Sequence, residues 1–236
     1  MHTLVDNYRH ELKFLMNKKT AEILKYRLSL LLPFDEFALE NDGSYYIRSL
    51  YFDDIYDTAY YEKIDGIEER EKYRIRFYNF DISYITIELK GKKGNVGYKL
   101  QDQINYKEYY YIINQDYDKI VIEDRKVLER FILDCKRKNL VPSIIVDYER
   151  TAYTYPISDV RLTFDSSIAS GKYDCDFFNK DMMLYDALEK DSLILEVKYN
   201  EFLPDFIKEV IQSVPMTRIS MSKFALCREL KGNVVA

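Results

Sequence analysis

Lys72-Tyr73-Arg74-Ile75-Arg76-Phe77-Tyr78 alternates basic residues with aromatic or aliphatic ones. Successive side chains of a β-strand point to opposite sides of the sheet. One face of this segment therefore carries Lys72, Arg74, Arg76 and Tyr78, and the other face carries Tyr73, Ile75 and Phe77. The pattern predicts a strand that packs one face on a core and presents a row of cations on the other.

The same alternation recurs along the chain. In Tyr84–Lys90, the residues Thr86, Glu88 and Lys90 share the face opposite the aliphatic residues. Five more segments read as strands: Tyr8–Phe14, Tyr45–Phe52, Ser143–Thr151, Val160–Phe164 and Leu193–Tyr199. Amphipathic patterns predict helices near residues 17–33, 125–138, 181–190 and 204–213, and the glycines of 91–97 predict a hairpin loop.

The charged faces decide between two sheet architectures. For a single strand, the ordinary interpretation is an antiparallel sheet with one face in water. Several of these faces are rich in Arg and Lys, however, although the chain has 35 Lys and Arg against 40 Asp and Glu. We therefore predict an α+β fold, an antiparallel β-barrel tunnel with helices packed on its outside, whose charged faces line the interior.

Composition sets further limits. A chain of 236 residues fits a single domain, 1–236, and lacks the run of about 18 apolar residues that a membrane helix needs. Its net charge of −5 gives no general attraction to nucleic acid or anionic lipid. Three cysteines without paired spacing indicate neither disulfides nor zinc, and two histidines make a Ser-His-Asp triad a poor prospect. The charged N-terminus predicts no export and hence a cytoplasmic protein.

Cations that converge inside a barrel need an anionic ligand. Two like charges about 7 Å apart repel by roughly 2 kcal/mol at an effective dielectric constant near 20. Inward carboxylates such as Glu11, Glu88 and Glu196 offset part of this repulsion and also suit a hard divalent cation. Arginine forks and lysine ammonium groups both bind phosphate oxygens. The charges alone thus favour a phosphate chain with a metal ion.

Seven short motifs occur in the order found in a known family. They are Glu11-Leu12-Lys13, Arg74-Ile75-Arg76, Glu88-Leu89-Lys90, Tyr148-Glu149-Arg150, Arg161–Asp165, Leu195–Tyr199 and Ser222-Lys223-Phe224. Over Tyr8 to about Cys227 the chain resembles the VTC-type polyphosphate polymerase domain of the triphosphate tunnel metalloenzymes. The resemblance implies a tunnel that binds ATP and polyphosphate or pyrophosphate, with Mn²⁺ or Mg²⁺ as cofactor, and the sequence indicates no particular oligomeric state.

The resemblance also implies roles for residues that match the motifs. The expected catalytic residues are Lys13, Arg74, Arg76, Lys90, Arg150, Arg161 and Lys223. The expected phosphate-binding residues are Lys99, Tyr148, Lys198 and Ser222, and the expected metal ligands are Glu196 and Glu11. Plainer roles remain open at this point: salt bridges from Arg74 and Arg76 to Glu88, a pair between Glu196 and Lys198, and Ser222 as N-cap of the last helix.

The first strand departs from the hydrolytic members of the superfamily. They carry Glu-x-Glu-x-Lys, whereas this chain has Arg9-His10-Glu11-Leu12-Lys13. Hydrolysis needs a water that is oriented and deprotonated, which is work for carboxylates and metals. A terminal phosphate is already ionised, so fewer acids favour transfer onto phosphate. We therefore expect a polyphosphate polymerase, with a triphosphatase and a non-catalytic polyanion-binding module as the alternatives.

Overall fold

The computed structural model describes residues 9–94, 96–173 and 176–234. The strands are β1 (Arg9–Asn17), β2 (Tyr45–Asp53), β3 (Glu69–Tyr78), β4 (Asp81–Lys93), β5 (Val96–Ile104), β6 (Val141–Tyr155), β7 (Val160–Gly171), β8 (Leu184–Asp186), β9 (Ser192–Tyr199) and β10 (Thr217–Arg218). The α-helices are α1 (Lys18–Ser29), α2 (Glu36–Leu39), α3 (Thr58–Ile64), α4 (Tyr106–Ile113), α5 (Lys126–Lys138), α6 (Asp205–Gln212) and α7 (Lys223–Val234).

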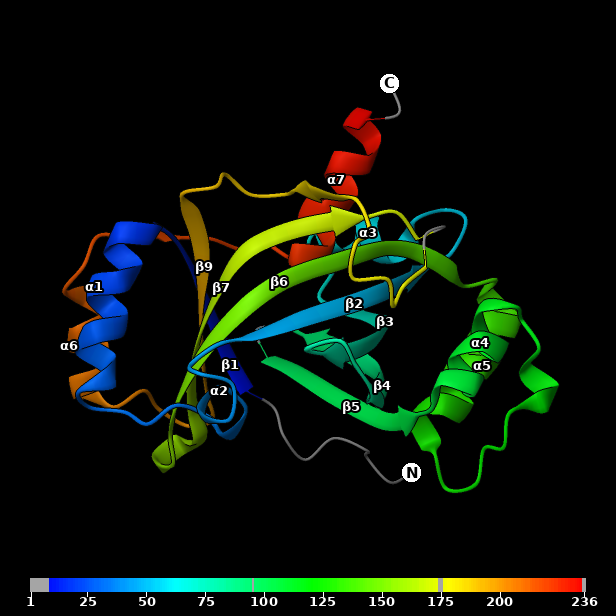
Figure 1. The fold of residues 1–236 in the computed structure, drawn as a ribbon, viewed down its shortest axis with the longest axis horizontal. Coiled ribbons are helices and arrows are strands. Elements are labelled where there is room, and N and C mark those ends of the chain that lie inside the picture. Colours follow the sequence, from blue (N-terminus) through cyan, green and yellow to red (C-terminus); the bar gives the residue numbers. More distant parts are fainter. Residues whose placement is uncertain (1–8, 95, 174–175, 235–236) are drawn as a thin grey trace.

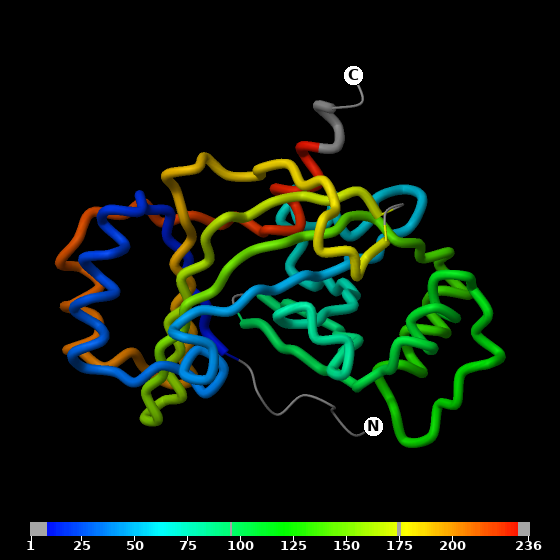
Figure 2. Tube along the Cα trace, viewed as in Figure 1, coloured from blue at the N-terminus to red at the C-terminus, as the bar shows by residue number. Residues whose placement is uncertain are grey.

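Eight strands close into an antiparallel ring. The order is β1-β5-β4-β3-β2-β6-β7-β9, and β9 pairs back onto β1. Figure 2 shows how strands distant in sequence, such as β1 and β9, come to lie side by side. The closing contact between β1 and β5 is short, with Arg9 opposite Gly97 and His10 opposite Val96. The predicted α+β barrel tunnel is confirmed.

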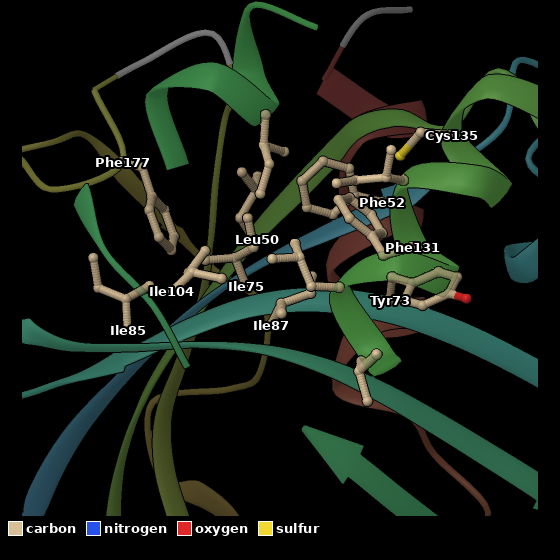
Figure 3. Packing of buried hydrophobic residues seen from close by; sticks show 14 of the residues in the cluster. Leu50, Phe52, Tyr73, Ile75, Ile85, Ile87, Ile104, Phe131, Cys135 and Phe177 are labelled. Atoms are coloured by element: carbon tan, nitrogen blue, oxygen red, sulfur yellow. The ribbon is translucent and has the colours of Figure 1, made fainter. Parts of the chain in front are cut away.

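Helices cover the outer, apolar faces of the ring. α4 and α5 pack at one end and α1 and α6 at the other (Figure 1). Figure 3 shows the first of these cores, in which Ile75 of β3 and Ile87 of β4 meet Phe131 of α5. The second core joins Leu24 of α1 and Ile207 of α6 to Leu195 of β9. These contacts bury the apolar half of each alternating strand, which leaves the charged half facing inward.

The interior is not charged throughout. Helix α7 packs Phe224 and Cys227 against Tyr51, Val146 and Ile194, which lie on the inner faces of β2, β6 and β9. The inner face of β6 is accordingly more apolar than the charged faces of the other strands led us to expect. The polar part of the interior therefore lies between the start of α7 and strands β1, β3, β4, β5 and β9, together with Arg150 of β6 and Asp165 of β7.

Two local expectations were wrong. Residues 181–190 form no helix; Leu184–Asp186 is the short strand β8, which pairs with the end of β7. The backbone of Leu184–Asp186 pairs instead with Ala169–Gly171 at the edge of β7. The weak amphipathic pattern of the segment did not indicate this pairing. The hairpin loop is also shorter than predicted, because β4 extends to Lys93. Gly91 lies under the Tyr98 ring, where a Cβ would approach the ring to 2.0 Å.

No helix in the described part of the chain is both long and apolar enough to cross a membrane.

A buried ion pair stands apart from the tunnel, on the outer faces of β2 and β6. Arg48 and Asp147 are 0% and 1% exposed, and the guanidinium donates to both carboxylate oxygens at 2.8–3.0 Å. Arg48 also donates to the carbonyl oxygen of Phe177 at 3.0 Å. The pair thus fastens the segment after β7 to the barrel.

Asp147→Asn is expected to lower the free energy of unfolding by about 4 kcal/mol, because the buried guanidinium loses its counter-charge. Denaturant unfolding measures the change. The matched control is Glu149→Gln, two residues along the same strand and exposed, which should change stability little. Equal effects of the two substitutions would contradict the assignment.

Candidate functional site

Nine cationic side chains gather on the inner side of the ring and at the start of α7. We call these residues the basic cluster: Lys13, Lys72, Arg74, Arg76, Lys90, Lys99, Arg150, Lys198 and Lys223. Four carboxylates lie among them: Glu11, Glu88, Asp165 and Glu196. By formal charge, the cluster therefore holds five more positive than negative groups.

One half of the cluster surrounds Glu196, which is 4% exposed. Its oxygens lie 2.7 Å from Lys223 Nζ, 3.4 Å from Lys198 Nζ and 3.5 Å from Lys13 Nζ. Burial raises the pKa of the Glu196 carboxyl, but these cations outweigh it and hold that pKa well below its usual range. The carboxylate is thus ionised and fixes the directions of several lysines.

Asp165 holds the bridge between β6 and α7. Its oxygens contact Arg150 Nε at 2.6 Å and Lys223 Nζ at 2.5 Å. Burial lowers the pKa of Lys223, but Asp165 and Glu196 raise it above its usual value. Lys223 therefore remains charged, at the point where the first turn of α7 enters the interior. A helix N-terminus adds a partial positive charge to such a position.

The other half of the cluster surrounds Glu88, which is fully buried. Arg74 contacts it at 2.6 Å, Lys99 Nζ lies at 3.7 Å and Arg76 at 4.0 Å. Arg76 is held instead by neutral oxygens, the hydroxyls of Ser49 and Tyr148, each at 2.9 Å. Its charge is consequently the least neutralised among the arginines of the cluster.

Lys72 shows the effect of the excess positive charge. Its ammonium group donates to Ser222 Oγ at 3.1 Å and lies 5.0 Å from the centre of the Phe224 ring. Burial, together with Lys90 and Lys13, lowers the pKa of Lys72 well below its usual value. A nearby anion would reverse that shift. The site therefore carries positive charge that its own carboxylates do not balance.

The structure brings the predicted residues together with one partial exception. Tyr148 lies inside the cluster, with Lys223 Nζ 5.0 Å from its ring centre, and Ser222 directly precedes α7. Lys99 reaches the cluster with a half-exposed side chain. Arg161 lies at the edge of the cluster, where it pairs with Asp35 and donates to Tyr45 Oη at 2.9 Å.

Some participants were not assigned from the sequence. Lys72 shares the strand face of Arg74, so the alternation already contained the signal. Asp165 closes the Arg161–Asp165 motif and shares a strand face with Thr163 and Arg161, which could have marked it. Asp35 and Tyr51 lie outside every basic motif. Only the three-dimensional contacts identify them.

The carboxylates allow a test of the metal assignment. Among the described residues no group of three or more His, Cys, Asp or Glu side chains is placed to hold a metal ion. Glu11 and Glu196 nevertheless interact, and the buried Oε1 of Glu11 has no hydrogen-bond partner among the described residues, although Lys13 Nζ lies 3.3 Å away as an ion-pair partner. Mg²⁺ is commonly held by one or two carboxylates together with substrate phosphates. The residues therefore fit a divalent cation that shares its coordination with a phosphate ligand.

A closed antiparallel ring of strands with an excess of cationic side chains on its inner side defines a tunnel-type fold. The family model of the VTC domain matches residues 8–230, so the chain belongs to the VTC domain family. Membership supports a metal-dependent function in polyphosphate or triphosphate chemistry. The chain matches none of the curated proteins with which it was compared.

Solved structures match this chain at low sequence identity. Protein PH1819 from Pyrococcus horikoshii OT3 is 14% identical with a TM-score of 0.50, over 94% of this chain and 99% of that one. A putative adenylate cyclase from Bacillus halodurans is 13% identical with a TM-score of 0.48, over 87% of this chain and 88% of that one. At such identities the first likeness shows the fold alone.

Proposed function

We propose that this protein is a polyphosphate polymerase, which transfers the γ-phosphoryl group of ATP to the end of a polyphosphate or pyrophosphate chain. The observation that carries the proposal is the surplus of five positive charges inside a closed ring of strands. Family membership supports phosphoryl chemistry in general. An extended polyanion is the ligand that such a row of cations neutralises best.

Each step follows from charges that the chain supplies. A terminal phosphate oxygen attacks the γ-phosphorus, the bond from that phosphorus to the β–γ bridging oxygen breaks, and ADP leaves with the electron pair. In this proposal Arg76 and Arg74 bind the oxygens of the transferred group, since guanidinium groups form charge-assisted hydrogen bonds with phosphate. Lys223 and Arg150, fixed by Asp165, position the reacting phosphates. The attacking oxygen is already ionised, so the step needs no general base.

The remaining assigned residues bind and orient. In this proposal Lys13, Lys90, Lys99, Arg161, Lys198, Tyr148 and Ser222 contact phosphate oxygens along the tunnel. Glu196 and Glu11 would hold Mn²⁺ or Mg²⁺, and the ion would neutralise charge on the phosphates. Glu88 and Asp165 orient Arg74 and Arg150 and offset part of the repulsion among the cations of the cluster.

The first strand favours transfer over hydrolysis. Arg9, which replaces the first glutamate of the hydrolytic pattern, forms an ion pair with Asp159. The inner face of β1 therefore offers Glu11 as its one carboxylate. This leaves fewer groups to deprotonate an attacking water.

Product analysis tests the proposal. The purified chain, supplied with ATP and Mn²⁺ and separately with Mg²⁺, should produce an acid-labile polymer longer than three phosphates. Release of orthophosphate alone would support the triphosphatase alternative instead. Tight, salt-sensitive binding of polyphosphate without turnover would support a non-catalytic binding module.

Binding should take up a proton on Lys72. The pKa of this lysine lies well below its usual value in the free protein, and a bound polyanion raises it. At a pH between the depressed pKa and the ordinary value near 10.5, the complex therefore holds more protons than its separate components. Affinity for tripolyphosphate is expected to fall as the pH rises through this range.

Calorimetric titration in buffers of different ionisation enthalpy measures the uptake. Lys72→Met should reduce the number of protons taken up, while Lys126→Met on the exposed start of α5 should leave it unchanged. Identical uptake by both variants would assign the proton to another group.

A further inference from the structure

A cavity of about 480 Å³ opens beside the basic cluster. Its wall combines α3 and the end of β2 with the first residues of β3, the end of β4 and the residues at the end of α5. α3 lies beside α7, whose first turn reaches the cluster (Figure 1). We call this space the side cavity. Its size is that of a pocket for a small organic molecule.

Lys72 joins the side cavity to the basic cluster. The residue lines the cavity, and its Nζ donates to Ser222 Oγ at 3.1 Å, next to Lys223. A ligand could therefore place its phosphates among the cluster residues and a second part in the side cavity. Such a ligand would contact Lys72 between its two parts. The two sites can be occupied by one molecule.

The side cavity differs from the cluster in charge. Five carboxylates and five cations line it, so their formal charges cancel. Several are already paired: Lys93 contacts Glu69 at 2.8 Å, and Glu71 contacts Arg130 at 2.5 Å. A polyphosphate chain would gain nothing from such a wall and would meet carboxylates along it. The wall instead suits an uncharged group.

The surfaces of the side cavity indicate what kind of uncharged group fits. Leu140 and the exposed edges of the largely buried Phe52 and Tyr73 supply apolar surface, and the Glu62 carboxylate supplies hydrogen-bond acceptors. Asp54 also lines the cavity, but its Oδ1 already accepts from the backbone N–H groups of Tyr56 and Thr58. A planar base is stabilised by apolar and aromatic contacts. The hydroxyls of a ribose commonly donate to an Asp or Glu. A nucleoside has both parts.

We propose that the side cavity binds the nucleoside part of the nucleoside triphosphate while Lys72 and the basic cluster bind its phosphates. The inference rests on the proposed function for its phosphate site. It adds that the protein distinguishes a nucleotide from inorganic tripolyphosphate through residues outside the ring interior. The base and sugar are then the part of the substrate that selects the phosphoryl donor.

Two variants test the proposal by binding, without turnover. Thr58 is exposed at the first turn of α3 and lines the side cavity, so Thr58→Trp fills part of it. Glu62→Ala removes an acceptor and needs no extra space. The probes are the β,γ-imido analogue of ATP and inorganic tripolyphosphate, measured by calorimetry with Mg²⁺ on the full chain. Lys126→Trp, at the first turn of α5 and outside the cavity, is the control.

Both cavity variants should weaken the ATP analogue about tenfold or more. Tripolyphosphate affinity should change by less than about twofold in both, as should all affinities of the control. Equal loss of both probes in a variant with unchanged thermal unfolding would overturn the proposal and make the cavity a phosphate site. Unchanged affinity of the analogue in Glu62→Ala and in folded Thr58→Trp would also overturn it. Wild-type protein that binds neither probe would overturn the proposed function itself.

Discussion

Arg76→Ala is expected to reduce polymer synthesis by about 10³-fold or more, the range found when a transition-state arginine is removed in phosphoryl transfer. The physical reason is the unneutralised charge of this side chain. Ser49 and Tyr148 orient the guanidinium through hydroxyl groups, and the Glu88 carboxylate stays 4.0 Å away. More of the charge of Arg76 is thus available to the transferred phosphoryl group than that of Arg74 or Arg150, which pair closely with carboxylates. Initial rates of polymer formation at saturating ATP measure the loss.

Stability distinguishes a functional arginine from a structural one. Because the cluster has surplus cations, Arg76→Ala should leave the thermal unfolding temperature unchanged or raise it. Arg76→Lys keeps the charge but loses the planar fork, and should recover only part of the rate. Arg137→Ala, exposed on α5, is the matched control with normal activity. A large drop in the unfolding temperature of Arg76→Ala together with normal activity of the folded fraction would refute the assignment.

Glu196→Gln is expected to cost about 3–5 kcal/mol of folding stability, since it leaves buried cations without their shared carboxylate. Lys223, Lys198 and Lys13 all lie within 3.5 Å of that group. Chemical denaturation measures the loss. Added tripolyphosphate should restore more stability to this variant, relative to its own ligand-free state, than it adds to the wild type, because the anion replaces the missing charge.

The same substitution reports on the metal. If Glu196 and Glu11 hold the cation, Glu196→Gln should raise the Mn²⁺ concentration needed for half-maximal activity. Glu201→Gln, exposed just after β9, keeps both properties normal and serves as the control. Normal metal dependence in Glu196→Gln with reduced stability would assign Glu196 to charge balance alone.

The alternation of side chains was sufficient to predict the ring and most of its inner cations. Arg74, Arg76 and Lys90 lie where the period of two placed them, because apolar neighbours on the same strands are held by the outer helices. The roles of these residues remain proposals. The positions themselves follow from local sequence and the requirement to bury one face of each strand.

Contacts between distant segments could not be predicted in this way. Nothing near Arg161 in the sequence indicates that it pairs with Asp35. Asp35 directly precedes α2 and accepts a hydrogen bond from the Arg161 guanidinium. The donation from Lys13 Nζ to the carbonyl oxygen of Met221 joins the first strand to the segment before the last helix. Periodicity also did not show that α7 covers the inner face of β6, because an apolar residue fits equally well against a helix inside the ring or outside it.

The short contact between β1 and β5 determines which backbone amides of the barrel exchange with solvent first. Eight residue pairs join β1 to β9, whereas two join β1 to β5 in the described chain. Local opening requires least energy where the fewest backbone hydrogen bonds must break together. Hydrogen–deuterium exchange should therefore be fastest for the ring amides around His10 and Gly97, and a phosphate chain bound across β1, β4 and β5 should slow exchange there more than at β6 or β7.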